Sequence, residues 1–321
     1  MKTMLRSVIK KSFSLTCAYY LLDNFFAKLQ GYTGTVATGS GTVHRDKSIE
    51  SSLTYIETVF NDYKLYSGKR QFNGRVAEVG PGDNLGVGLL FLADGCESVD
   101  LVDRFFSKRN ARQHATIYRA LIARHAKLLE KFGDVDCNYE TAFQGLQRFY
   151  GKNAAAERFF TQPESYDLIV SRAVFEHVYN PQFAIKRMAA ALKKDGVFLH
   201  KVDFRDHGMF SEHFHELAFF EVPEGLYARM TRDSGRPNRV LIDSYRRVLG
   251  ETLPDHTLLI TRLAGVGDIV PHLPYEQIDA TLRNQAIAYV KSVRANFSKS
   301  LRSLSDEDLS VAGIFIVAHK N

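Results

Sequence analysis

Cysteine is scarce in this 321-residue chain, and the three cysteines, Cys17, Cys96 and Cys137, are scattered without forming a closely spaced pair. Cysteine-built zinc sites need such pairs, and the disulfide frameworks of secreted proteins usually have an even number of cysteines. The sequence therefore argues against a metal site built on cysteine. It predicts reduced thiols and a cytoplasmic location.

Long apolar runs are also missing. The best candidate, Phe13 to Leu22, is shorter than the ~20 residues that cross a bilayer, and it ends at Asp23 without the small-residue cleavage site of a signal peptide. Around it, apolar residues recur at spacings of mostly three and four, as in an amphipathic helix with lysines and arginines on another face. The apolar residues are Met4, Val8, Leu15, Ala18, Leu22, Phe25 and Leu29. Two interpretations stay open: a helix that covers the domain, and a peripheral membrane contact.

The charge balance shows no large excess of one sign. Lys and Arg number 42 and Asp and Glu number 36, for a net charge of +6. Such a small surplus is typical of an ordinary basic surface, so we do not expect a nucleic-acid partner. With 45% hydrophobic residues, the chain is expected to fold as a globular protein.

Predicted strands and helices alternate along most of the chain. We expect residues 1–45 to form an N-terminal helix and linker, and residues 46–321 to form one domain. Strands at 75–79, 98–103, 166–171 and 196–202, with helices at 85–92, 111–132 and 181–192, predict an α/β fold with a doubly wound, Rossmann-like, mostly parallel sheet. A terminal antiparallel strand is expected at 309–318. A helical insertion at about 206–250, after the fifth strand, is expected to cover the substrate side.

The segment from Glu78 to Gly86 joins the first strand to a helix through a turn rich in glycine. The start of such a helix offers unpaired N–H groups to a polar ligand. Asp103, which is 103 − 82 = 21 residues past Gly82, could accept both ribose hydroxyls of an adenosine. Glu78 would repel a pyrophosphate but suits a cationic sulfonium or ammonium group. These residues favour S-adenosyl-L-methionine over the alternative, an NAD(P)-dependent Rossmann oxidoreductase.

From these motifs, the chain resembles the class I S-adenosylmethionine-dependent methyltransferases over roughly 74–202 and the last strand. The segment 78–82 is similar to the first motif of that family, the segments 166–171 and 174–178 to its fourth strand and the stretch after that strand, and 192–199 to the turn into its fifth strand. The resemblance implies an enzyme that binds S-adenosyl-L-methionine. The cofactor residues that we expect are Glu78, Gly80, Pro81, Gly82, Asn84, Gly86, Asp103, Arg104, Asn153, Ala154, Ser171 and Arg172. At Asn153-Ala154 the chain departs from the acidic residue that is common in the family, although an amide oxygen can accept the same hydrogen bond.

Histidines follow the fourth and fifth predicted strands, where ligands of open α/β sheets bind. An acceptor hydroxyl must lose a proton as it attacks the methyl group, and a histidine can remove it. We expect His207 and His177 to be catalytic, with Asp206 holding the tautomer of His207. Substrate contacts are expected from Arg205, His213 and Arg239. No metal site is predicted, because these histidines and aspartates lack a firm ligand spacing.

The histidine-rich region favours methyl transfer to oxygen. The sequence also lacks the Asn/Asp-Pro-Pro-aromatic tetrad that is typical of amine-methylating nucleic-acid enzymes. Together with the basic insertion, these features favour a small-molecule or glycan-type acceptor. A homodimer stays open, as does a second alternative, a non-catalytic, membrane-associated scaffold that keeps the methyltransferase fold.

Overall fold

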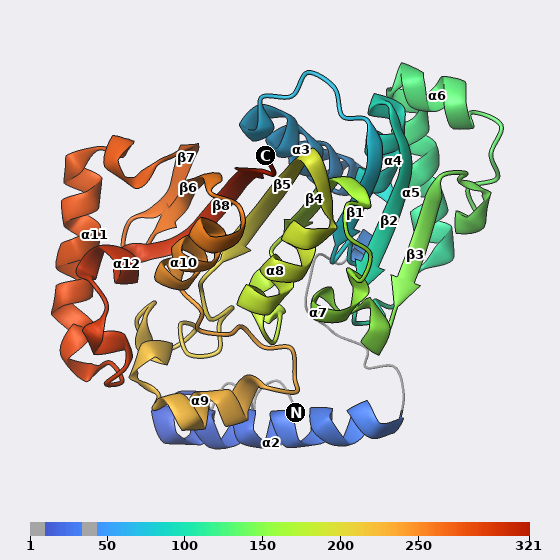
Figure 1. Ribbon diagram of the computed structural model, residues 1–321. Coiled ribbons are helices and arrows are strands. Elements are labelled where there is room, and N and C mark those ends of the chain that lie inside the picture. The colour runs from blue at the N-terminus through green and yellow to red at the C-terminus, as the bar shows by residue number, and fades with distance from the viewer. Residues whose placement is uncertain (1–9, 34–43) are drawn as a thin grey trace.

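The computed structural model describes residues 10–33 and 44–321. Its centre is one eight-stranded sheet with the order β3-β2-β1-β4-β5-β8-β6-β7 (Figure 1). The strands are β1 (Gly74–Val79), β2 (Cys96–Asp103), β3 (Leu146–Tyr150), β4 (Tyr166–Arg172), β5 (Leu192–Asp203), β6 (Asp255–Leu263), β7 (Gly267–Leu273) and β8 (Val311–His319). Strands β1 to β5 run parallel, and β8 lies antiparallel between β5 and β6. The predicted α/β class, the mostly parallel sheet and the antiparallel last strand are confirmed.

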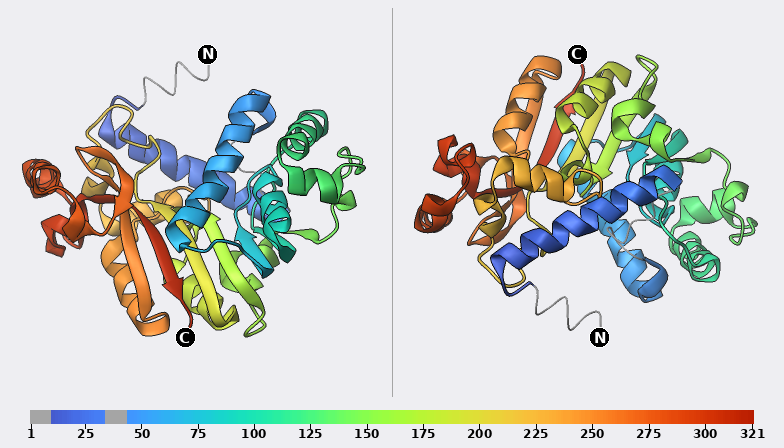
Figure 2. Two further views of the ribbon diagram at one scale, coloured as in Figure 1. Left: turned by 90° about the horizontal axis from the view of Figure 1, so that it is seen from above. Right: turned by 90° about the horizontal axis from the view of Figure 1, so that it is seen from below.

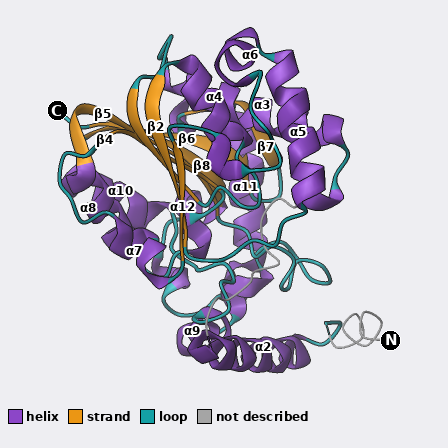
Figure 3. Cartoon of the chain, turned by 90° about the vertical axis from the view of Figure 1, so that its right-hand side faces the viewer, coloured by secondary structure: helices purple, strands orange, loops and turns teal. Residues whose placement is uncertain are grey.

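Helices cover both faces of the sheet, as Figure 3 shows. One face packs against α3 (Ile49–Ser67), α4 (Gly86–Asp94), α5 (Ala111–Arg124) and α6 (Ala126–Phe132). The other face packs against α7 (Ala156–Phe159), α8 (Pro181–Ala191), α10 (Ile242–Thr252) and α11 (Ala280–Val293). Successive strand residues belong to opposite cores, as Val76 and Ala77 do, because strand side chains alternate between faces. Burial on both faces explains why these strands are apolar along most of their length.

Several elements differ from the sequence-based expectations. The helix expected at 111–132 is broken at His125, whose backbone is extended and whose Nε2 lies 3.0 Å from Glu57 Oε1. Strands β3 and β7, at the two edges of the sheet, pair with β2 and β6 and were not predicted. The insertion expected at 206–250 overlaps α10, which packs on α8 and contributes Tyr245 and Leu249 to the core. Helix α10 therefore belongs to the helical layer on the sheet rather than to an insertion.

The N-terminal helix α2 (Phe13–Thr33) lies beside α9 (Glu224–Thr231), beyond the carboxyl ends of the parallel strands (Figures 1 and 2). Its buried residues are Thr16, Cys17, Tyr20 and Asn24. The expected apolar stripe faces solvent instead, through Leu15, Ala18, Leu22, Phe25 and Leu29. Met4 and Val8 of that stripe lie outside the described residues, as does most of the expected linker. No helix of the described segments is long and apolar enough to cross a membrane.

Candidate active site

The turn after β1 has a backbone that requires glycine. Gly80 and Gly82 have φ values of +70° and +67°, a region that side chains with a Cβ rarely adopt. A Cβ on Gly80 would lie 2.3 Å from Cγ2 of Val174, in the segment that follows β4. At the start of α4, the Gly86 N–H donates to Asn84 Oδ1 at 2.6 Å. The glycines therefore let the turn pack closely while its polar groups remain on a cavity wall.

A cavity of about 590 Å³ opens at this turn, within the ~300–1,000 Å³ that small-molecule sites usually occupy. It lies at the carboxyl ends of β1, β2 and β4, where open α/β sheets bind ligands. Most of the expected cofactor residues line it, namely Glu78, Gly80, Pro81, Gly82, Asn84, Gly86, Asp103 and Arg172. His177 and His207 lie on the same lining.

Glu78 is the most unusual group on the cavity wall. The residue is 7% exposed, and its Oε2 has no hydrogen-bond partner among residues 10–33 and 44–321. Burial raises the pKa of Glu78 to about 8, although Arg148 opposes the shift. A buried carboxyl without a partner is costly unless a ligand satisfies it. It fits a ligand with a cationic amino group, as S-adenosyl-L-methionine has.

Asp103 and Asn84 complete the polar part of this wall. Asp103 Oδ1 accepts from the Phe105 N–H at 2.8 Å, and burial raises the pKa of Asp103 to about 7. Asn84 Nδ2 is buried, and no other group in the described part of the chain accepts its hydrogen bonds. An adenosine brings ribose hydroxyls and ring nitrogens to such groups. The residues present therefore fit the nucleoside cofactor.

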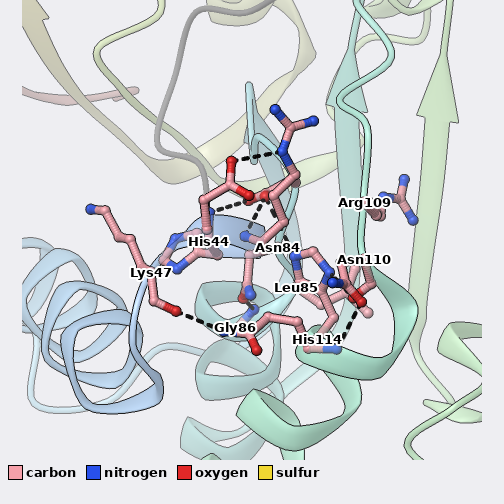
Figure 4. A network of polar contacts seen from close by, with 12 residues as sticks. His44, Lys47, Asn84, Leu85, Gly86, Arg109, Asn110 and His114 are labelled. Atoms are coloured by element: carbon pink, nitrogen blue, oxygen red, sulfur yellow. Dashed lines mark hydrogen bonds and ion pairs between the residues drawn. The ribbon is translucent and has the colours of Figure 1, made fainter.

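Sequence reasoning missed the segment around His44, which closes one side of the cavity. The Asp83 carboxylate accepts the backbone N–H groups of His44 and Arg45 at 3.2 and 3.1 Å, and His114 Nε2 lies 3.5 Å from it (Figure 4). Burial alone would raise the pKa of Asp83, but the nearby His114 and the hydrogen bonds from these backbone groups hold it below the ordinary value. His44 lines the cavity and lies 39 residues before Asp83. No local spacing in the sequence indicates this contact.

Other expected cofactor residues do not line the cavity. Asn153 is exposed, and Ala154 is buried in the 3-10 helix Lys152–Ala154. Ser171 Oγ lies 2.6 Å from His200 Nδ1 inside the sheet. The Arg104 guanidinium lies 4.0 Å from the centre of the Tyr179 ring.

The two histidines expected to be catalytic lie together on the lining. Their ring centres are 5.0 Å apart, and His207 Nε2 is 3.4 Å from Asp203 Oδ2. Burial, with a smaller contribution from His207, lowers the pKa of His177 to about 4, so His177 is neutral at pH 7. Burial would raise the pKa of Asp203, but hydrogen bonds from His207 and Arg205 hold it well below the usual range. Asp203 is therefore an ionised partner for His207.

The expected role of Asp206 is wrong. Its carboxylate accepts the backbone N–H groups of Gly208, Phe210 and Ser211 at 2.6 to 3.0 Å, so it fixes the turn after His207 rather than the imidazole. An aspartate at the start of a turn commonly binds backbone groups further along the chain. Asp203 takes the position beside His207 instead.

The expected substrate residues do not meet in one place. Arg239 Nη1 donates to the carbonyl oxygens of Phe219 and Val222, and its guanidinium lies over the Tyr227 ring at 4.2 Å. These contacts hold the insertion together and correct the expectation of a substrate contact. His213 is exposed and away from the cavity lining. Arg205 pairs with Asp203 and lines a neighbouring cavity of about 250 Å³.

One group of side chains at this cavity could hold a metal ion: His177 and His207 line the cavity, and Glu176 is buried next to them. Ligand atoms of Glu176, His177 and His207 all lie within 4.8 Å of one another. Neither carboxylate oxygen of Glu176 has a hydrogen-bond partner within the two described segments, and burial raises the pKa of Glu176 well above the ordinary value. Two imidazoles and a carboxylate are a common ligand set for divalent transition metals.

Comparisons with known proteins place the chain in a family. A family model described as a methyltransferase domain matches residues 54–237. No curated protein matches the chain. Among solved structures, a candidate methyltransferase from Bacillus halodurans is 15% identical, with 84% of this chain and 99% of that chain covered and a TM-score of 0.39. A candidate sarcosine dimethylglycine methyltransferase from Galdieria sulphuraria is 16% identical, with coverage of 90% and 93% and a TM-score of 0.41.

A third solved structure is phosphoethanolamine N-methyltransferase 2 of Haemonchus contortus with S-adenosyl-L-methionine. It is 14% identical, with 88% of this chain and 60% of that chain covered and a TM-score of 0.41. The family match spans more than half of the 321 residues, and it rules out the nicotinamide-dependent alternative. The chain belongs to the methyltransferase domain family and is an S-adenosylmethionine-dependent methyltransferase.

Proposed function

We propose that this enzyme methylates an oxygen atom of a small-molecule or glycan-type acceptor, with His207 removing the acceptor proton. The observation that carries the proposal is the position of His207 on the cavity lining, with Nε2 3.4 Å from the ionised Asp203. An aspartate that keeps the proton on Nε2 leaves Nδ1 free to accept one. The arrangement supports a general base, which an acceptor hydroxyl requires and an amine or carboxylate needs less.

The cofactor residues have separate tasks in this proposal. Glu78 would receive the amino-acid end of S-adenosyl-L-methionine, Asp103 the ribose hydroxyls, and Asn84 a polar atom of the nucleoside. Gly80, Pro81, Gly82, Gly86 and Arg172 complete the wall on which it lies. When bound, this cofactor supplies an electrophilic methyl group. The protein then has to hold the acceptor oxygen in line with it, ~3–3.5 Å away.

The proposal is tested with His207→Asn. Asparagine tolerates the φ of +50° at this position but cannot act as a base near neutral pH. We expect kcat with hydroxyl acceptors to fall by ~100-fold to ~10,000-fold, the usual contribution of a general base. The affinity for S-adenosylhomocysteine should change less than about twofold, since the ligand's binding groups lie elsewhere on the wall. Release of S-adenosylhomocysteine is measured with panels of phenols, sugars and carboxylic acids.

The matched control is His213→Asn, because His213 is exposed and outside the cavity lining. Its turnover should equal that of the wild type. Equal turnover of both variants would refute the assignment of His207. No turnover by the wild type on any of these acceptors, with S-adenosylhomocysteine bound normally, would contradict the proposed acceptor class.

The Glu176, His177 and His207 group favours a second candidate, in which a divalent metal ion activates the acceptor hydroxyl. A bound metal lowers the pKa of a coordinated hydroxyl without a separate base. Treatment with a chelator distinguishes the two candidates. Activity that is lost with chelator and restored by Mn²⁺ or Zn²⁺ supports the metal, and unchanged activity supports His207 as the base.

A further inference from the structure

The outward face of α2 is an apolar stripe that residues 10–33 and 44–321 leave exposed to solvent. We call Leu15, Ala18, Leu22, Phe25, Phe26 and Leu29 the α2 stripe; all six are exposed. Leu22 and Phe26 keep 59% and 58% of their surface in solvent. A surface helix of a globular protein normally turns such a stripe toward the core. A contiguous exposed apolar patch usually marks a binding surface.

Polar anchors hold the opposite face of α2 against the domain, so the helix cannot turn the stripe inward without losing them. Asn24 Oδ1 accepts the backbone N–H groups of Asp233 and Ser234 at 2.7 and 2.9 Å. Asp23 pairs with Arg236 at 3.0 Å. The outward position of the stripe is therefore fixed by specific contacts with the neighbouring loop.

The exposed charged side chains of α2 and of the neighbouring segment are mostly basic. Between residues 11 and 29, whose side chains the structure describes, the exposed charged residues are Lys11 and Lys28. Arg229 on the adjacent helix α9 and Arg232 directly after it are exposed, and the acidic residue Glu224 pairs with Arg239. An apolar stripe with flanking lysines and arginines is the pattern of helices that lie in the surface of an anionic bilayer.

We propose that the α2 stripe docks on an anionic lipid surface and holds the methyltransferase cavity beside it. The segment before α2 contacts the turn that carries His207: Lys10 Nζ donates to the carbonyl oxygen of Gly208 at 2.7 Å. The loop anchored by Asn24 includes Gly235, which lies close to His177. In this arrangement α2 lies on the membrane surface. No helix of the described residues is long and apolar enough to cross the membrane.

The test is co-sedimentation of the full chain with vesicles of phosphatidylcholine alone and of phosphatidylcholine with phosphatidylglycerol. We expect binding to the anionic vesicles, weakened by high salt. The double variant Leu22→Gln and Phe26→Gln should bind them at least about tenfold more weakly, because two large apolar side chains no longer enter the interface. The variant Leu65→Gln is the matched control, since Leu65 is 66% exposed on α3, away from this face.

Several outcomes would overturn the proposal. These are no binding of the wild type to either vesicle, equal loss of binding in the Leu65 control, or a wild-type dimer in light scattering that the α2 double variant dissociates. The last result would assign the stripe to a second copy of the chain. The double variant must bind S-adenosylhomocysteine as the wild type does, which shows that it is folded. Because His207→Asn should still bind vesicles, failure of the proposed function and failure of lipid docking are separable.

Discussion

The buried carboxyl of Glu78 makes the stability of the free enzyme depend on pH. Its pKa is raised to about 8 in the folded protein, above the ordinary value of 4.5 in an unfolded chain. Between these values the folded state keeps a proton that the unfolded state has lost, so the free energy of unfolding falls as pH rises. In the Glu78→Gln variant, we expect this pH-dependent decrease in the free energy of unfolding to be smaller by more than about 1 kcal/mol. Urea unfolding at about pH 5 and about pH 8 measures it.

The same substitution should weaken the binding of S-adenosylhomocysteine about tenfold or more, because a charge-assisted hydrogen bond to the ligand's amino group is lost. Glu97→Gln is the matched control, since Glu97 is exposed on the neighbouring strand β2. The control should leave both the pH dependence and the affinity unchanged. A variant of Glu78 with wild-type affinity would contradict the assigned role.

Alanine substitutions at Gly80 and at Gly250 should have opposite effects on stability. A Cβ at Gly80 would meet Val174 at 2.3 Å and would be strained at a φ of +70°, whereas at Gly250 in α10 it meets nothing within 4 Å. Gly80→Ala should cost about 1–3 kcal/mol of stability. Gly250→Ala should be neutral or stabilise by up to about 1 kcal/mol, because alanine favours the helix. Chemical denaturation of both variants tests this, and equal effects would contradict it.

Some site residues could be predicted because the end of a parallel strand fixes their place. Glu78 is the last residue but one of β1, Asp103 is the last residue of β2, and both line the cavity as expected. Asp206 and Asp203 both lie near His207 in the sequence, so spacing alone could not distinguish the turn-forming carboxylate from the imidazole partner. That choice depends on which backbone N–H groups each carboxylate meets in the folded turn.

At the scale of single elements, α2 depends on Asn24. Replacing it by alanine leaves the N–H groups of Asp233 and Ser234 without their acceptor. We expect Asn24→Ala to lower the free energy of unfolding by about 1–3 kcal/mol. Urea denaturation measures the change. Asn61→Ala, at an exposed position of α3, should change stability by less than about 0.5 kcal/mol, and a similar loss there would contradict the anchoring role.

Periodicity predicted that α2 is a helix but not which of its sides meets the domain. The usual assumption, that an apolar stripe faces inward, fails because Asn24, Thr16 and Tyr20 supply the buried contacts. Likewise, β7 has few buried residues and a proline, so its sequence shows little of a strand pattern. Pairing with β6, which is a tertiary contact, decides its structure.

For the whole molecule, ligand binding and folding should be coupled, because the cavity wall joins segments that are distant in sequence. S-Adenosylhomocysteine at 100 times its dissociation constant should raise the free energy of unfolding by about 2.7 kcal/mol. NADH at the same concentration should have no effect. Thermal unfolding with each ligand measures this, and stabilisation by NADH alone would contradict the cofactor assignment.

The contact between Asp83 and the 3-10 helix His44–Asp46 has a consequence for the rate at which ligands leave. The carboxylate ties this segment to the glycine turn by two backbone hydrogen bonds, and His44 faces the cavity from it. Any movement of this segment away from the cavity breaks both hydrogen bonds, so we expect them to slow the departure of a bound nucleoside. Without them, the nucleoside should leave faster and be bound less tightly.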